Sequence, residues 1–273
     1  MEVGLLLQML GLLIVVGGIA GVLAGLLGVG GGIVLVPAFF YVFQTLGFSG
    51  PQLMQMCLAT SLATIIVTSV RSVHSHNKKN AVDWGILQGW SPGIVVGAIA
   101  GVWIASGLRS ETLQAIFGCL AMIVGLYMLL GRSHWRLRDA MPGPLGTAAL
   151  SPVMGFGSVL MGIGGGSFGV PLMSLMNVPI HRAVATAAGF GVVIAVPSVI
   201  GFLLVQIDPA TRPPLTIGAV NLAAFLITIA MTLMTTPIGV KLAHAMDAGP
   251  LKKAFGVFLT LVALNMLRKA LGY

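Results

Sequence analysis

Apolar residues occur along the chain in long blocks that are separated by short polar segments. Seven of these blocks reach the length needed to cross a bilayer, about 17–25 residues each. They lie at roughly 5–27, 52–73, 84–106, 112–130, 145–163, 183–205 and 215–240, and shorter apolar segments lie at 33–46, 167–176 and 251–267. This pattern predicts an all-α, polytopic membrane helical bundle that occupies the whole chain.

A glycine-rich run interrupts the first part of this pattern. The sequence GVGGGIVLVP at 28–37 places four glycines in five positions. Inside an ordinary helix these four would cost about 3–4 kcal/mol relative to alanine. The run recurs as GIGGGSFGVP at 162–171. We therefore expect a glycine-interrupted hairpin or broken helix at both places.

Further matches in the same order indicate an internal duplication. ATSLA at 59–63 matches ATAAG at 185–189, and the residues 101–118 match 239–256, ending in LQAIFG and LKKAFG. Val82-Asp83 likewise aligns with Val220-Asn221. We predict a first transmembrane repeat at 1–130, a basic cytoplasmic linker at 131–144 and a second transmembrane repeat at 145–273.

The distribution of lysine and arginine bears on how the repeats are related. If each glycine run turns the chain back, each repeat has five segments and the two repeats are inverted. Ten basic residues then share one face and four share the other, whereas parallel repeats of four spans give nine and five. The positive-inside rule favours the inverted arrangement, with the ten in the cytoplasm of a multi-pass inner-membrane protein. These ten are Arg71, Lys78, Lys79, Arg132, Arg136, Arg138, Arg182, Lys241, Lys252 and Lys253.

Paired glycine interruptions at equivalent places in two repeats are the best sequence indication of a secondary transporter's substrate site. The first amides of a half-helix lack carbonyl partners and carry the positive end of its dipole, which suits an anion. The hydroxyls of α-helical segments nearby could add donors. The predicted substrate-binding residues are Gly30, Gly31, Gly32, Gly164, Gly165, Gly166, Ser167, Thr60, Ser61, Thr186, Ser72 and Ser198.

Two prolines follow the glycine runs, and a packing role for the same residues stays open. Pro37 and Pro171 are expected to stiffen the half-helices near their first turns, where a missing amide is tolerated. Glycines can also simply allow helices to approach closely, and serine or threonine can bond carbonyls of its own helix. Either alternative would leave the site without a ligand.

Composition and the remaining motifs exclude several classes of function. Hydrophobic residues make up 57% of the chain and charged residues 7%, with a mean hydropathy of +1.04, so the net charge of +8 marks topology and not a nucleic-acid partner. The six acidic residues fall at loops or span ends, which argues against a buried proton relay. Ser158 has no evident base, GVGGG lacks the ending of a phosphate-binding loop, and HSH at 74–76 offers two metal ligands at best. We expect no enzyme activity, no cofactor and no metal.

The paired GxGGGxxxVP runs, ATSLA and ATAAG, VDW at 82–84 and the closing LQAIFG and LKKAFG together resemble the sulfite exporter TauE/SafE family over nearly the whole chain. The resemblance implies a transporter of sulfite, sulfonates or related organosulfur anions. Its Gly-Pro motif falls on Gly30 to Gly32 with Pro37, and on Gly164 to Gly166 with Pro171. The second repeat departs at Ala187-Ala188, where the first has Ser61-Leu62.

Together these features predict a secondary transporter that exports small sulfur-containing anions, such as sulfite and sulfoacetate, through a midplane site. A negative cell interior favours anion export by about 2.3 kcal/mol per charge per 100 mV, so export needs no coupling ion. An anion-selective channel, an importer of organosulfur anions and a membrane scaffold without flux remain alternatives. The expected partners are the small anion and the lipid bilayer, and a homodimer is left open.

Overall fold

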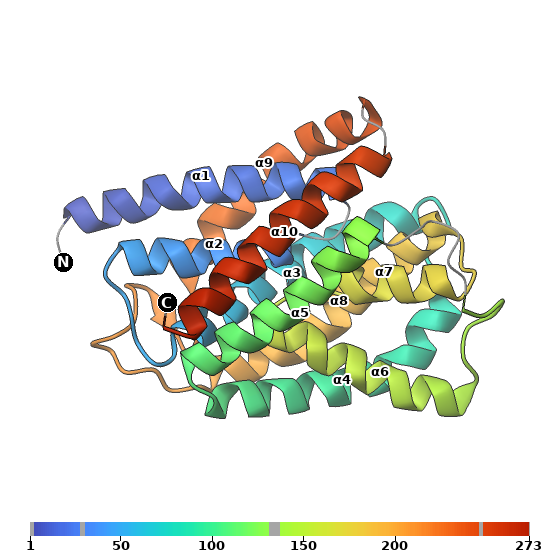
Figure 1. Ribbon diagram of the computed structural model, residues 1–273, viewed down its shortest axis with the longest axis horizontal. Helices are drawn as coiled ribbons and strands as arrows, with labels where there is room; N and C mark the ends of the chain where they lie inside the picture. The colour runs from blue at the N-terminus through green and yellow to red at the C-terminus, as the bar shows by residue number, and fades with distance from the viewer. Residues whose placement is uncertain (1–2, 28–30, 131–136, 246–247, 273) are drawn as a thin grey trace.

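The computed structural model describes residues 3–27, 31–130, 137–245 and 248–272, and these are almost entirely helical (Figure 1). One short hairpin, β1 (Thr216–Ile217) with β2 (Val220–Asn221), is the exception within these ranges. Six helices, namely α1, α3, α4, α5, α8 and α9, are long and apolar enough to cross a membrane. The helices are α1 (Val3–Leu27), α2 (Gly32–Thr45), α3 (Leu53–Asn77), α4 (Trp84–Gly107), α5 (Ser110–Leu130), α6 (Pro144–Leu160), α7 (Gly166–Leu175), α8 (Ile180–Leu203), α9 (Leu222–Ala245) and α10 (Ala248–Ala270). The predicted polytopic helical membrane bundle is confirmed.

Element boundaries differ from the prediction in the second half of the chain. The span expected at 145–163 is the 17-residue helix α6, because the chain turns at the glycine run that follows. The span expected from 215 begins instead with the hairpin, in which Thr216 pairs with Asn221 and Ile217 with Val220. The Asn221 side chain accepts a hydrogen bond from the amide of Ala224 at 2.8 Å, and this cap sets the start of α9.

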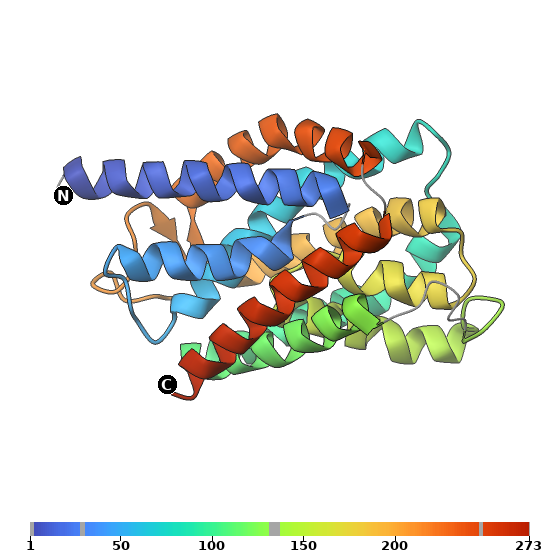
Figure 2. The same ribbon diagram turned by 45° about the horizontal axis from the view of Figure 1, so that its top comes forward.

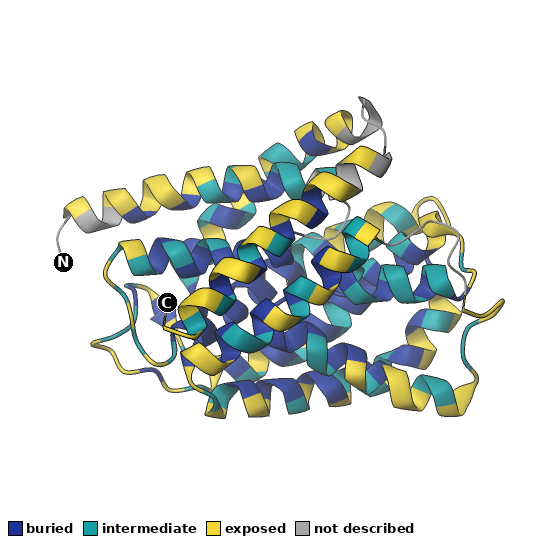
Figure 3. Ribbon diagram, in the orientation of Figure 1, coloured by how far each residue is buried: buried dark blue, intermediate teal, exposed yellow. Residues whose placement is uncertain are grey.

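The helices lie largely along one common direction, with α3 and α8 in the interior (Figures 1 and 3). Helix α1 packs against α9, α4 packs against α6, and α5 packs against α10. If α1–α5 and α6–α10 are taken as two groups, the first helix of each group packs against the fourth helix of the other group. The third helices, α3 and α8, pack against each other, and so do the fifth helices, α5 and α10. Two equivalent groups of helices would produce this pattern, and the repeat boundaries stay a prediction.

Helices α5 and α10 pack against each other in opposite directions. On α5, Gly118 lies against Leu267 of α10, whereas Gly125, further along α5, lies against Thr260 and Gly256, which come earlier in α10. Helices α5 and α10 therefore run antiparallel. Inverted repeats would produce this arrangement, and the inversion itself stays a prediction.

Glycines outside the two runs allow close helix contacts. Gly97 of α4 lies against the backbone of Pro152 in α6, and Gly155 of α6 lies against the backbone of Ile94 in α4. Small residues at such crossings let helix backbones approach each other closely. In lipid, helices associate through this close packing because the hydrophobic effect does not drive them together. The packing interpretation therefore holds for these glycines.

Candidate functional site

The first glycine run separates α1 from α2. Residues 28–30, which include the predicted site residue Gly30, lie outside the described part of the chain. Gly31 has a φ of 74°, in the left-handed region that glycine tolerates best. Its carbonyl accepts hydrogen bonds from the amides of Val34 at 3.0 Å and Leu35 at 3.1 Å. Gly31 thus begins a new helix, and α2 returns alongside α1 (Figure 2).

The second glycine run ends α6 and starts α7. The amide of Ile163 donates to the carbonyl of Ser158 at 2.9 Å, and Gly162 has a φ of 59°, a glycine-dependent helix ending. Helix α7 begins after Gly165, whose carbonyl accepts from the amide of Gly169 at 2.7 Å. Both runs therefore interrupt the helical path, as the sequence predicts.

The two breaks meet in the interior, where Ser61 of α3 joins them. The fully buried Ser61 hydroxyl donates to the carbonyl of Gly162 at 2.7 Å and lies 3.5 Å from the carbonyl of Gly32. A Cβ atom added at Gly32 would stand 3.0 Å from the Gly162 carbonyl oxygen and 3.2 Å from Cα of Ile163. A break from each half of the chain thus contacts the other.

The first turn of α7 has hydrogen-bonding capacity that the described residues do not fill. Ser167 is 6% exposed, and its hydroxyl has no hydrogen-bond partner among them. The amides of Gly166, Ser167 and Phe168, the first three of α7, make no hydrogen bond to a carbonyl four residues back among the described residues. A buried hydroxyl left unpaired costs about 1–3 kcal/mol. An oxyanion placed here would satisfy several donors at the positive end of the helix dipole.

Thr60 and Thr186 each bind the backbone just before a helix of the other half and do not lie free beside the breaks. The Thr60 hydroxyl accepts from the amide of Asn221 at 3.0 Å, just before α9. At the equivalent place in the other half, the Thr186 hydroxyl accepts from the amide of Asp83 at 2.9 Å, just before α4. Each threonine fastens the start of a helix from the opposite half of the chain.

Ser198 and Ser72 are not brought to the breaks as hydrogen-bonding groups. The buried Ser198 hydroxyl donates to the carbonyl of Ile194 in its own helix at 2.6 Å, as the packing alternative predicts. Ser72 is on the same helix as Ser61 but about 16 Å further along at the usual helical rise. Of the serines predicted as contacts, Ser61 and Ser167 are the two positioned at the glycine runs.

The remaining glycines of the second run are also required for packing. A Cβ added at Gly165 would collide with Cβ of Phe190 and stand 3.0 Å from the amide nitrogen of Gly191. A Cβ at Gly164 would stand 3.2 Å from Cγ2 of Ile65. These glycines let the break lie close to α3 and α8, and Gly166 is the first residue of α7.

The two prolines do not occupy the positions that the sequence analysis expected. Pro37 lies inside α2 and Pro171 inside α7, both in the second helical turn. Here the missing amide is not one of the free amides of the first turn, so the reason that the sequence analysis gave for tolerating it does not apply. Proline at these positions removes the amide that would bond the carbonyl four residues back, on Ile33 and on Ser167.

Comparisons with known proteins agree with this architecture. The family model described as Sulfite exporter TauE/SafE matches residues 13–266. The chain belongs to the TauE/SafE sulfite exporter family. A "Probable membrane transporter protein" of Haemophilus influenzae is 30% identical over 239 residues, covering 87% of this chain and 90% of that protein. Another, from Methanocaldococcus jannaschii, is 26% identical over 242 residues, covering 86% and 87%.

A third relative, from Bacillus subtilis, carries the same description and is 30% identical over 179 residues, covering 57% of this chain and 64% of that protein. No solved structure matches the chain. The relatives are named as membrane transporters, which makes transport the activity class of this TauE/SafE chain.

Sequence reasoning missed two features of this TauE/SafE member, one at the breaks and one at the start of α4. Gly162, the first residue of the second glycine run, supplies the carbonyl to which Ser61 donates. It was not among the predicted site residues. Asp83 forms an ion pair with Arg182, with Oδ2 3.0 Å from Nη2. The alignment of Val82-Asp83 with Val220-Asn221 marked this position without giving it a role. Among the described residues, no three metal-ligating side chains gather into a metal site.

Proposed function

We propose that this TauE/SafE protein is a secondary transporter that exports small sulfur-containing oxyanions, such as sulfite and sulfoacetate, and binds one anion where the two glycine breaks meet. The observation that carries the proposal is the first turn of α7, where the buried Ser167 hydroxyl lacks a partner among the described residues. This turn follows the break that Ser61 joins to the other half of the chain. The family's description supports sulfite as a substrate.

Neutral donors suit a site that must release its ligand. Hydroxyl and amide groups at a helix start attract an oxyanion without a fixed positive charge that would retain it. The described acidic residues do not lie at the breaks. Asp83 is the cap of α4, Glu111 begins α5, and Asp139 and Asp208 are in loops. An anion at the breaks therefore meets donors, and none of the described carboxylates lies beside it.

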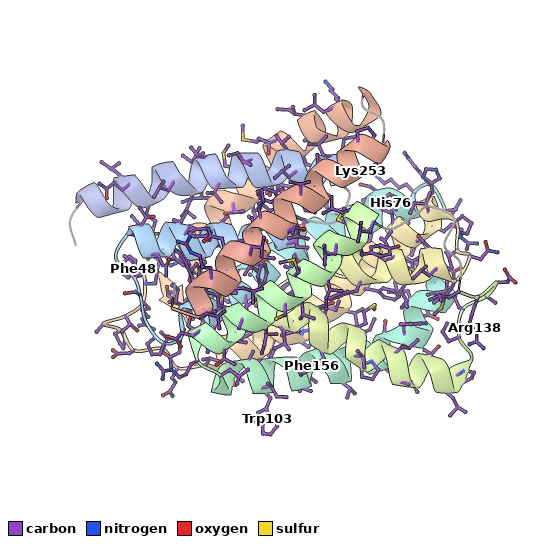
Figure 4. All side chains as sticks on the ribbon, in the orientation of Figure 1. Phe48, His76, Trp103, Arg138, Phe156 and Lys253 are labelled. Atoms are coloured by element: carbon purple, nitrogen blue, oxygen red, sulfur yellow. The ribbon has the colours of Figure 1, made fainter. Side chains whose placement is uncertain are left out.

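The charge distribution supports the direction of export. Arg138 and His76 lie toward one end of the bundle together with Lys253, and Phe48 lies at the opposite end (Figure 4). We infer that the basic end faces the cytoplasm and that the membrane is the inner membrane. A negative interior then drives anions outward by about 2.3 kcal/mol per charge per 100 mV.

Inverted repeats would let one binding site face both sides in turn. Transporters with inverted repeats open by exchanging the conformations of their two halves around a fixed site. The antiparallel packing of α5 and α10 supports this relation here. The contact between the breaks, carried by Ser61, would stay near the centre of such a movement.

Counterflow of radiolabelled sulfite into proteoliposomes tests the proposal. A carrier gives saturable uptake that accelerates when unlabelled sulfite is present inside, and sulfoacetate should compete while taurine and sulfate define the selectivity. Protein-free liposomes provide the background. Flux that rises linearly without acceleration would indicate a channel, and the absence of flux for every sulfur anion would refute the substrate class.

A further inference from the structure

Two equivalent seams join the halves of the chain, one between α4 and α8 and one between α9 and α3. In the first, the Asp83 amide donates to Thr186, and in the second the Asn221 amide donates to Thr60. Asp83 also caps α4 by accepting from the amide of Ile86 at 3.1 Å, as Asn221 caps α9. The hydrogen bonds at the helix starts are therefore equivalent in the two seams.

The side chains make the two seams chemically different. Asp83 is paired with Arg182, and their side chains are 25% and 51% exposed, so water and solutes reach the pair. The repeat alignment places Met56 where the other half has Arg182, so the second seam has no counterpart of this cation. Asn221 is neutral and fully buried, and its amide group donates to the Pro214 carbonyl at 2.8 Å. A charge pair thus fastens the α4–α8 seam alone.

The α4–α8 seam leads from this ion pair to the second glycine break. Further along both helices from the pair, Leu87 of α4 packs against Gly189 of α8. Next along these helices, the centroid of the Trp90 ring lies 6.1 Å from the centroid of the Phe190 ring, and both side chains are buried. Phe190 in turn contacts Gly165 at the start of α7. A continuous row of packed side chains therefore runs from the ion pair to the break.

The equivalent positions in the α9–α3 seam carry small hydroxyl side chains. Alignment of the repeats places Thr228 opposite Trp90 and Thr64 opposite Phe190. Both threonines are buried, and the Thr228 hydroxyl has no hydrogen-bond partner among the described residues. The contact between Trp90 and Phe190 next to the break, like the ion pair, is therefore present in the α4–α8 seam and not in the α9–α3 seam.

We propose that Asp83 and Arg182 form an anion-sensitive latch, in which the transported anion opens the α4–α8 seam by replacing the Asp83 carboxylate on Arg182. This inference rests on the proposed function for the identity of the anion. A guanidinium binds sulfonate or sulfite oxygens as it binds a carboxylate, through paired N–H donors. The anion reaches Arg182 fully only when Asp83 has released it, so it binds the open seam better and shifts the equilibrium toward opening. The buried and neutral Asn221 offers no such exchange.

Alkylation of a cysteine placed inside the seam measures its opening directly. The reporter is Leu87→Cys in a background in which the buried Cys57 is replaced by alanine and the exposed Cys119 by serine. A membrane-impermeant maleimide is added from the basic side of oriented proteoliposomes. Sulfoacetate serves as the probe anion because sulfite itself adds to maleimides, and sodium chloride at equal ionic strength is the reference.

Two variants remove the charge pair with little other change. Asp83→Asn keeps a side-chain cap for α4 and the backbone amide that donates to Thr186, but it loses the charge. Arg182→Gln removes the cation. The matched control is Arg109→Gln, which breaks the exposed pair of Arg109 with Glu111, 3.4 Å apart, at the start of α5.

Sulfoacetate should raise the alkylation rate of the reporter about two- to fivefold, the range expected for a partly exposed ion pair. Asp83→Asn and Arg182→Gln should reach the raised rate without the anion and gain little from it, and Arg109→Gln should match the parent. Equal anion-free rates in parent, Asp83→Asn and Arg182→Gln would overturn the latch. A full sulfoacetate response in Arg182→Gln would overturn the exchange on Arg182. If sulfoacetate and sulfite are not transported, the proposed function fails, while the anion-free rates still decide the latch.

Discussion

Replacing Ser61 by alanine removes the hydroxyl that joins the two helix breaks. Gly162 follows the end of α6, and no backbone amide of the described residues donates to its carbonyl, so Ser61→Ala leaves this buried acceptor unpaired. The cost of such an acceptor is about 1–3 kcal/mol. For a chain of this size, that cost lowers the melting temperature by roughly 2–10 °C.

Ser198→Ala is the matched control, because Ser198 is equally buried and lies on the equivalent helix α8. Its hydroxyl donates to the carbonyl of Ile194, which already accepts the helical amide. Its removal leaves no acceptor unpaired and should change stability by less than about 0.5 kcal/mol.

Thermal unfolding in detergent and sulfite flux in proteoliposomes measure the two consequences of Ser61→Ala. If the arrangement in which the breaks touch loses about 1.4 kcal/mol, the ratio of this arrangement to one in which the breaks are apart falls about tenfold. The initial rate of transport falls in proportion to the population that the joined arrangement loses. If Ser61→Ala and Ser198→Ala have the same melting temperature and the same flux, the idea that the joined breaks form the transport site is refuted.

Three further substitutions separate binding from packing. Ser167→Ala should leave the melting temperature unchanged or raise it, because an unpaired buried hydroxyl is removed, yet raise the KM for sulfite roughly tenfold; an unchanged KM would remove Ser167 from the site. Gly165→Ala should cost about 1–3 kcal/mol by overpacking against α8, whereas Gly89→Ala, in open space on α4, should stabilise the protein by up to about 1 kcal/mol; similar melting temperatures would contradict this packing. Gly31→Ala should cost about 1–2 kcal/mol because of its left-handed φ, and a melting temperature equal to that of the parent would show that the turn is not strained.

The sequence predicted the features that depend on local pattern and on duplication. Four glycines in five positions cannot continue a helix cheaply, and their recurrence located both breaks before α2 and α7. Hydropathy located the six long spans because lipid requires continuous apolar helices. It could not separate the hairpin before α9 from the helix itself, because the hairpin residues are largely apolar as well.

The partners of individual hydroxyls could not be predicted, because they lie far away in the chain. Thr60, Ser61 and Thr186 share one sequence context. The two threonines nevertheless accept from backbone amides that precede α9 and α4, whereas Ser61 donates to the opposite break. The alignment of the repeats identifies equivalent positions, but it does not show which residues face each other across the two halves. The ion pair of Asp83 with Arg182 could not be predicted for the same reason, because the two residues are far apart in the chain.

Sulfite efflux from proteoliposomes under a clamped membrane potential tests most directly whether an anion passes through this site without a coupling ion. The account predicts saturable efflux that accelerates as the interior is made more negative and that falls in Ser167→Ala. Efflux that does not respond to the potential, or that proceeds equally well in Ser167→Ala, would contradict electrogenic export through the joined helix breaks.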